Sequence, residues 1–471
     1  MAGVAQYVDF DYIPLKVAKD NKRKVTRKRT NLEMKLGENY PPEGHSSMMC
    51  SNPEQANQYR ILSFGGARRN DESTWEQTGS AIAEFFIIAD DEDVSISSST
   101  VCKTKGGSLP PLHGTAVINL GTRFMIWGGL DLCEYRCRDD LLILEELPRQ
   151  RGGASIPHFQ VTYVETLSSK TPSRKGYDLP HQTGSVPSGR TGHTLTKIPG
   201  TNRAILFGGL SMQSDGEFGP RWRKACKDGR FYFLDTDTFE WTHVKVPLLQ
   251  PKAYHSANIL VNDHDYTLAI VGGVVFNGRV ASHRVAINEV IILTMDKELK
   301  DFSLKEVTLD PKTPNLPIVF ISSHATTLHC DNIIVSGGIQ TYSDEVKMDE
   351  APSPSPIVYS INITDKEFHA FPKTSKASQL YATFGHTLHN LTNDNSLLVL
   401  GGTSKQISLL TDRDFEPEPC EYEPCTIASS SEKDNPVWVQ CDSAKCKKWY
   451  HTFCAKVVHV PSGNYYCKNC K

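Results

Sequence analysis

The sequence of 471 residues lacks several features that would place it in a familiar class of protein. It has no run of about 18 apolar residues, which argues against a membrane-spanning helix. Its first ten residues have no apolar core of the kind found in secretory signals, so we expect reduced cysteines rather than disulfides. Charge is balanced, with 51 Lys and Arg against 54 Asp and Glu, and therefore gives no global reason to predict nucleic-acid binding.

Sequence motifs of common enzymes are also missing. The chain contains no P-loop, no dinucleotide-binding glycine motif after an apolar strand, and no recognisable Ser/His/Asp constellation. Amphipathic helical periodicity is scarce along the whole chain. These gaps argue for a non-catalytic protein built mainly from β-strands.

What the sequence does contain is a repeat. Six apolar runs each end in a pair of glycines, and the first glycines of successive pairs are 63, 80, 64, 65 and 64 residues apart. A short apolar run predicts a strand buried on both faces, and paired glycines allow positive φ and a close backbone approach. The runs with their glycines are Ile61–Gly66, Phe124–Gly129, Ala204–Gly209, Leu268–Gly273, Ile333–Gly338 and Leu397–Gly402.

A second set of apolar runs alternates with the first. An all-β array that repeats every 64 or so residues predicts a six-bladed β-propeller, and the double glycines resemble the Kelch repeat with longer loops. The sixth repeat lacks an outer strand after Ile407–Leu410, so we expect Gln6–Val17 or Leu32–Leu36 to supply it and close the ring. The second runs are Phe85–Ile88, Leu141–Leu144, Phe231–Leu234, Val290–Leu293 and Ile357–Ile361.

A histidine precedes each of the last five double glycines. A residue that recurs at one place in every repeat does the same structural job each time, so we interpret these histidines as hydrogen-bonding caps of strand turns rather than catalysts. They are His113, His193, His255, His324 and His386.

Three segments between strands stand out. The interval of 80 residues marks an insertion between Glu145 and Gly189 that predicts a mobile loop. A polar loop from Gly209 to Gly229 and a basic run near the N-terminus could contact phosphates or a partner protein, and the run could instead be a nuclear-import signal or a solvated segment. The candidate contact residues are Lys22, Arg23, Lys24, Arg27, Lys28 and Arg29 in the run, and Arg221, Arg223 and Lys224 in the loop.

The C-terminal 52 residues hold seven of the 13 cysteines. A stretch this short cannot bury an adequate core, and zinc can supply the missing stability. Tetrahedral zinc takes four Cys or His ligands, so eight ligands predict two closed structural sites with no open catalytic position. The ligands are Cys420, Cys425, Cys441, Cys446, His451, Cys454, Cys467 and Cys470.

The order and spacing of these ligands resemble a PHD finger. Trp438 lies three residues before Cys441, and Trp449 lies two residues before His451, as is characteristic of that family. The resemblance implies that Cys420, Cys425, His451 and Cys454 hold one zinc ion, and that Cys441, Cys446, Cys467 and Cys470 hold the other. It also implies a reader of methylated histone tails, since aromatic faces attract a quaternary ammonium. The candidate histone-binding residues are Trp438, Trp449, Asp442 and Tyr422.

The combination of a Kelch-like propeller with a C-terminal PHD finger resembles the family of the V(D)J recombination-activating protein 2. Leu109–Leu112 and Asn464–Cys467 add local similarity, whereas the acidic hinge of that family is almost absent and Cys470 replaces its last histidine ligand. The resemblance implies a nuclear, non-catalytic accessory subunit that docks a recombinase or transposase catalytic subunit and assists DNA binding. The alternative is a chromatin adaptor or reader subunit of a histone-modifying complex.

This interpretation divides the chain into four parts. A basic N-terminal segment covers residues 1–44, and the propeller covers residues 45–410. A short acidic linker covers residues 411–419, and the zinc finger covers residues 420–471.

Overall fold

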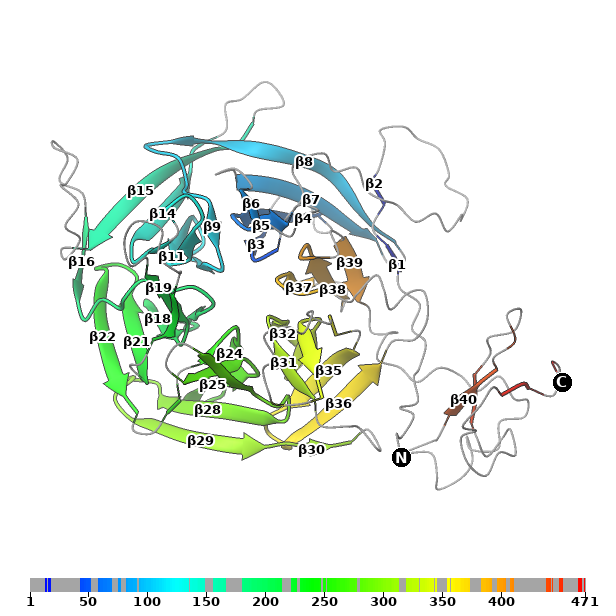
Figure 1. Ribbon diagram of the computed structural model, residues 1–471. Coiled ribbons are helices and arrows are strands. Elements are labelled where there is room, and N and C mark those ends of the chain that lie inside the picture. The colour runs from blue at the N-terminus through cyan, green and yellow to red at the C-terminus, as the bar shows by residue number, and fades with distance from the viewer. Residues whose placement is uncertain are drawn as a thin grey trace.

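The computed structural model is all-β over the residues that it describes (Figure 1). None of these residues forms a helix, and therefore none forms one that could cross a membrane. The described residues are 13–14, 16–17, 43–51, 58–69, 75–77, 82–90, 93–134, 136–148, 156–166, 180–213, 222–226, 229–246, 249–250, 252–277, 280–312, 319–329, 331–342, 344, 354–355, 357–372, 383–391, 396–403, 407–410, 438–441, 443, 449–451, 465–467 and 470.

Six antiparallel units of four strands follow one another along the chain. Unit 1 contains β3 (Ser46–Ser51), β4 (Gln58–Phe64), β7 (Ile82–Asp90) and β8 (Asp93–Lys105). Unit 2 contains β10 (Ala116–Asn119), β11 (Arg123–Trp127), β14 (Leu141–Glu146) and β15 (His158–Thr166). Unit 3 contains β17 (Thr194–Lys197), β18 (Arg203–Phe207), β21 (Arg230–Asp235) and β22 (Glu240–Lys245).

The second half of the array repeats this order. Unit 4 contains β24 (Ser256–Val261), β25 (Asp265–Val271), β28 (Glu289–Asp296) and β29 (Phe302–Thr308). Unit 5 contains β32 (Ala325–His329), β33 (Asn332–Ser336), β35 (Ile357–Asn362) and β36 (Glu367–Pro372). Unit 6 contains β37 (Thr387–Leu391), β38 (Ser396–Leu400) and β39 (Ile407–Leu410), and its fourth strand is β1 (Ile13–Pro14) from the other end of the chain.

The apolar runs form the second strand of each unit because they are buried on both faces. Side chains alternate between the two faces of a strand, so Ile61 packs against unit 6 while its neighbour Leu62 packs against unit 2. Six such apolar clusters lie between adjacent units, including one that joins unit 1 to unit 6. We call the interface between two adjacent units a seam.

The units surround a common centre, where a ring of backbone hydrogen bonds links them (Figure 1). One residue per unit, just before the inner strand, donates its N–H to the carbonyl of the equivalent residue in the preceding unit, at 2.8–3.1 Å. The N–H of Gly44 donates to the carbonyl of Gly385, so unit 1 is bonded to unit 6. The arrangement is consistent with a β-propeller. The six residues are Gly44, Gly114, Gly192, Tyr254, Ser323 and Gly385.

The double glycines pack each unit against the next. Gly208 has a φ of 69°, and a side chain on it would overlap the carbonyl of Lys252 and the ring of His255 in unit 4. The N–H of Gly209 donates to that same carbonyl at 2.9 Å. Position 208 therefore requires glycine, because its φ is positive and because a side chain would have no room.

Among the described residues, short additional strands precede the inner strand or follow the double glycine in units 1 to 5. The segment between Gly209 and Gly229, which the sequence predicts to be a loop, contains a hairpin because β19 pairs with β20. This hairpin lies between the short strands of units 2 and 4. The additional strands are β5 (Ala67–Arg69), β6 (Trp75–Gln77), β9 (Leu112–His113), β12 (Leu130–Asp131), β13 (Arg136–Cys137), β19 (Leu210–Gln213), β20 (Trp222–Ala225), β23 (Lys252–Ala253), β26 (Val274–Asn277), β27 (Val280–Arg284), β31 (Phe320–Ser322) and β34 (Ile339–Thr341).

The prediction of a mobile loop between Glu145 and Gly189 is wrong for its described residues. They include β15, the outer strand of unit 2, and β16 (His181–Gly184), which bridges β15 and β22 in parallel. Gln182 fixes β16 in place, because its side-chain oxygen accepts hydrogen bonds from the indole N–H groups of Trp127 and Trp241 at 3.2 and 2.8 Å. A buried amide that satisfies two buried indoles orders this segment.

Two further short strands lie along outer strands. β2 (Lys16–Val17) runs parallel to β8, and β30 (Asp310–Pro311) runs parallel to β36. Since β1 pairs with β39 of unit 6 and β2 pairs with β8 of unit 1, the N-terminal strands join the last unit to the first (Figure 1). β1 lies within the segment Gln6–Val17 that the sequence offers for this role.

Candidate functional site

One polar position recurs in each unit. It directly follows the residue of positive φ that takes part in the central ring of backbone hydrogen bonds. It is occupied by His45, His193, His255, His324 and His386 in five units and by Thr115 in unit 2. The inclusion of His113 among the recurring histidines is therefore wrong, because that residue lies two positions earlier, on β9. His45 is missed because a longer connection between β3 and β4 separates it from its double glycine.

Three of these histidines bond across seams instead of capping turns in their own units. The imidazole Nε2 of His255 lies 3.1 Å from the hydroxyl of Thr194 in unit 3. That of His324 lies 2.8 Å from the hydroxyl of Ser256 in unit 4. The prediction of a structural, hydrogen-bonding role is supported, but the bonds join neighbouring units.

Two seams lack the hydroxyl that accompanies the histidine elsewhere. The residue equivalent to Thr194 is Ala116 in unit 2 and Ala325 in unit 5, each just after the recurring position. Neither ring nitrogen of the facing His193 and His386 has a partner in hydrogen-bonding geometry within the described part of the chain. The rings of His193 and Trp127 instead meet in a T-shaped arrangement, with centroids 5.1 Å apart.

Burial keeps these imidazoles neutral. It lowers the pKa of His193 to about 3, assisted by the nearby charge of Arg190, and lowers the pKa of His386 to about 3. The pKa of His324 falls to about 4 for the same reason, and that of His255 lies well below its usual value. A neutral ring held between sheets can accept and donate hydrogen bonds, but its pKa is far from that of a general base working near pH 7.

The seam between units 6 and 1 carries a longer polar chain. The Nε2 atom of His45 lies 3.2 Å from the hydroxyl of Thr387, which is bonded to the hydroxyl of Ser47. The Ser47 hydroxyl in turn lies 2.6 Å from Nε2 of His389. This chain of side chains joins two units that are not consecutive in sequence.

The C-terminal residues form a separate cluster of thiols. The sulfurs of Cys441, Cys467 and Cys470 all lie within 4.8 Å of one another. The first two thiols are buried, and the N–H of Cys467 donates to the sulfur of Cys441 at 3.3 Å. Tyr450, which is also buried, packs beside them. Three of the four ligands assigned to one zinc ion are thus brought together.

This cluster fits a zinc ion. Thiolates are preferred zinc ligands, and a tetrahedral site needs its four ligands within a few ångströms of one another. A backbone N–H aimed at a sulfur stabilises the thiolate form that a metal needs. Cys446, the fourth ligand of this set, lies outside the described residues, as do Cys420, Cys425 and Cys454 of the other set.

The remaining predicted contact residues are placed only in part. β40 (Trp438–Gln440) pairs with β41 (Trp449–His451), which sets Trp438 opposite His451. Arg223 and Lys224 lie on β20, opposite Met212 and Ser211. The candidates that lie outside the described residues are Lys22, Arg23, Lys24, Arg27, Lys28, Arg29, Arg221, Tyr422 and Asp442.

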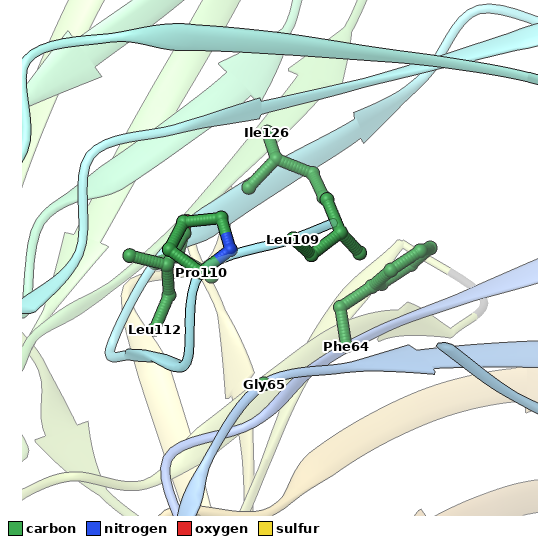
Figure 2. A pocket seen from close by; sticks show the side chains of 7 residues that line it. Phe64, Gly65, Leu109, Pro110, Leu112 and Ile126 are labelled. Atoms are coloured by element: carbon green, nitrogen blue, oxygen red, sulfur yellow. The ribbon is translucent and has the colours of Figure 1, made fainter. Parts of the chain in front are cut away.

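A small pocket lies at the seam between units 1 and 2. Figure 2 shows Leu109, Pro110 and Leu112, which precede unit 2, facing Phe64 of unit 1 and Ile126 of unit 2. The hydroxyl of Thr115 also borders the pocket, but it donates to the carbonyl of Trp127 at 3.0 Å. We therefore interpret the apolar motif at Leu109–Leu112 as packing between units.

No model of a known protein family matches the chain, and no curated protein matches it. Among solved structures, the chain is similar to a chain in the cryo-EM structure of RAG in complex with one melted RSS and one unmelted RSS. The sequence identity is 16%, and the TM-score is 0.48. The match covers 84% of this chain and 98% of the other.

Proposed function

We propose that this protein is a non-catalytic accessory subunit of a DNA recombinase or transposase complex in the nucleus. Residues 45–410 with β1 form a closed six-bladed Kelch-like propeller that docks the catalytic subunit and helps it hold DNA. A PHD-type finger with two structural zinc ions follows and reads methylated histone tails. The observation that carries the proposal is the presence of a ring of six sheet units and a thiol cluster of zinc-ligand type in one chain.

The roles of the buried polar groups support a scaffold. Burial keeps the recurring histidines of units 3 to 6 neutral within seams, and those of units 4 and 5 bond to the neighbouring unit. Binding residues on such scaffolds usually lie on the loops and hairpins that rigid sheets position. The hairpin of β19 and β20 is of this kind, and it carries Arg223 and Lys224. A basic hairpin suits a contact with DNA phosphates or with an acidic partner surface.

The proposed docking function can be tested with the purified full-length chain. We expect it to co-purify in a defined ratio with a recombinase or transposase catalytic subunit and to leave DNA intact on its own. Replacing Arg223 and Lys224 by alanine should weaken DNA binding by the complex and make its salt dependence shallower by about 0.9 per lost phosphate contact. Nicking of DNA by the chain alone with a divalent metal would overturn the proposal. Co-purification only with histone-modifying subunits would favour the chromatin-adaptor alternative.

The finger can be tested by metal analysis and calorimetry on the full chain. We expect two zinc ions per chain and tighter binding of a trimethylated histone peptide than of its unmethylated form. Trp449→Ala should remove about 0.5–2 kcal/mol of that preference without changing the zinc content. Equal affinity of the wild type for both peptides would refute the reading function, and fewer than two zinc ions would refute the ligand assignment.

A further inference from the structure

The outer strands of units 1, 2, 3 and 5 are each covered by a second strand that runs parallel to them (Figure 1). In unit 1, β2 covers β8 at Ser95 and Ile96. In the other three units, the end of β8 covers β15, β16 covers β22, and β30 covers β36, and the covering strand pairs with the first residues of the outer strand. Units 2, 3 and 5 therefore use one repeated position for adding a strand.

The covered position is built in the same way each time. The N–H of Ser185 donates to the carbonyl of Trp241 at 2.7 Å, and the N–H of Lys312 donates to the carbonyl of Phe368 at 2.9 Å. The residue covered is aromatic in all three units, and its exposure is 0% for Phe159, 1% for Trp241 and 4% for Phe368. Covering the backbone thus also buries the aromatic ring.

Unit 4 has the same aromatic residue without a cover. Phe302 is the first residue of β29, and its register opposite Met295 matches that of Phe159 opposite Glu146. Its ring lies 5.3 Å from that of Phe233 but stays only partly buried. Among the described residues, no strand pairs with the outer edge of β29.

The backbone of Phe302 faces that edge. The N–H of Leu309 donates to Asn288, next to β28, at 2.8 Å, and the N–H of Asp310 donates outward to Lys366 at 2.8 Å. Because backbone groups alternate along a strand, the N–H and C=O of Phe302 and Leu304 point outward like those of Asp310. A row of unpaired backbone groups is a template for another strand.

The connection that precedes unit 4 is short and contains two prolines. β16 follows β15, and β30 follows β29, so these two covering strands come from the connection that leaves the preceding outer strand. The corresponding connection after β22 spans only residues 246–251 and contains Pro247 and Pro251, which have no N–H to donate. The N–H of Val246 is bonded to Gly229. Among its described residues, this connection supplies no strand to the edge of β29.

We propose that the outer edge of β29 at Phe302–Leu304 is a docking site for an extended segment of a partner polypeptide, which adds as a parallel strand. Backbone hydrogen bonds would give affinity, as in other strand-addition complexes. The exposed side chains nearby include Lys300, paired with Glu298, together with Lys305 and Glu306, so no single charge sign dominates. The segment that fits is accordingly uncharged and narrow, like the Thr183–Ser185 stretch that covers unit 3. This proposal does not depend on whether the partner is a recombinase.

Hydrogen–deuterium exchange on the full-length chain tests the proposal. The probe is a free peptide with the sequence of residues 180–187, which covers unit 3 within the chain. Without the peptide, we expect the amides of Phe302 and Leu304 to exchange about tenfold or more faster than that of Trp241. Excess peptide should slow the exchange of both amides. The control peptide is N-methylated at the positions of Thr183 and Ser185, which removes the donors and keeps the side chains, and should have no effect.

Four outcomes would overturn the proposal. Slow exchange at Phe302 in the free chain at every concentration would mean that the chain covers its own edge. Protection that appears only when the chain is concentrated would identify a second copy as the occupant. No protection by the unmodified peptide would mean that the edge does not accept a strand, and equal protection by the N-methylated peptide would mean contact through side chains alone. None of these results depends on zinc, histone or DNA binding, so failure here is distinguishable from failure of the proposed function.

Discussion

The five seams that contain a recurring histidine fall into two kinds that differ by one hydroxyl group, while the seam between units 1 and 2 has Thr115 at that position. Between units 3 and 4, units 4 and 5, and units 6 and 1, the histidine of one unit is bonded to a Ser or Thr of the unit before it. At the two seams that contain Ala116 and Ala325, the facing histidine has no such hydroxyl. Both kinds of seam are sealed by apolar clusters and by the central backbone bonds. Sheet packing and backbone hydrogen bonds therefore hold the units together at both kinds of seam. The hydrogen bond of the histidine adds stability to the seams that have it.

The largest effect should come from the glycines beneath the histidines, which both kinds of seam share. Gly208→Ala places a methyl group against the carbonyl of Lys252 and the ring of His255, so we expect a loss of more than about 3 kcal/mol or failure to fold. Gly200→Ala is the control, because Gly200 has a similar φ of 72° and no atom within 4 Å of an added methyl group. It should cost only about 1–2 kcal/mol. Equal urea midpoints for the two variants would contradict this account of the glycines.

Acid should destabilise both kinds of seam together. The histidines titrate near pH 6.5 when unfolded, whereas burial lowers the pKa of His193 to about 3 and that of His324 to about 4 in the fold. Their neutral form therefore contributes full stability above pH 6.5, and this contribution is lost as the pH falls from 6.5 towards 4. Each such histidine should contribute about 1.4 kcal/mol per pH unit in that window.

Urea midpoints measured between pH 7.5 and 5 give this dependence. His193→Phe keeps an aromatic ring beside Trp127 and removes one titrating group, so its stability should fall less steeply with acid. A wild-type midpoint that stays constant over this range would show that the imidazoles are not buried in the neutral form.

Much of this ring could be predicted from the sequence, because its determinants are local. Apolar runs ending in Gly-Gly predict the strands, and the recurring histidine predicts a structural position. The details that depend on three-dimensional register could not be predicted. His113 precedes its double glycine by 15 residues, as His193 does, yet the position belongs to Thr115, because the backbone of Gly114 rather than residue spacing defines the register.

The covering strands and the finger show the same limit. β16 lies in a polar segment that resembles a loop, and the hydrogen bonds of Gln182, together with pairing to β15 and β22, explain why it is ordered. In the finger, the resemblance to a PHD finger implies that Cys441, Cys467 and Cys470 belong to one zinc site, and the structure places their sulfurs within 4.8 Å of one another. The other set of ligands is still a prediction.

Removing the hydroxyl from a seam that has one should have an intermediate effect. Thr194→Val keeps the shape of the side chain and leaves Nε2 of the buried His255 without its partner. We expect the free energy of unfolding to fall by about 1–3 kcal/mol, the cost of an unsatisfied buried polar group. Thr196→Val on the same strand is the control, since its hydroxyl makes no hydrogen bond within the described residues. If the two variants are equally stable, the histidine bond does not stabilise the seam.

The smallest effect should come from adding a hydroxyl to a seam that lacks one. Ala116 is paired with Trp127 in the same register that pairs Thr194 with Phe207, so Ala116→Ser places its hydroxyl where the ring of His193 can bond to it. The expected gain is about 0.5–1.5 kcal/mol, measured as a higher urea midpoint at pH 7.5. Ala204→Ser is the matched control: it buries a hydroxyl in the apolar cluster of the same seam and should lower the midpoint. If Ala116→Ser lowers it as well, the two kinds of seam differ by more than a hydroxyl, and the histidine at the alanine seams is held by ring packing, such as the contact of His193 with Trp127.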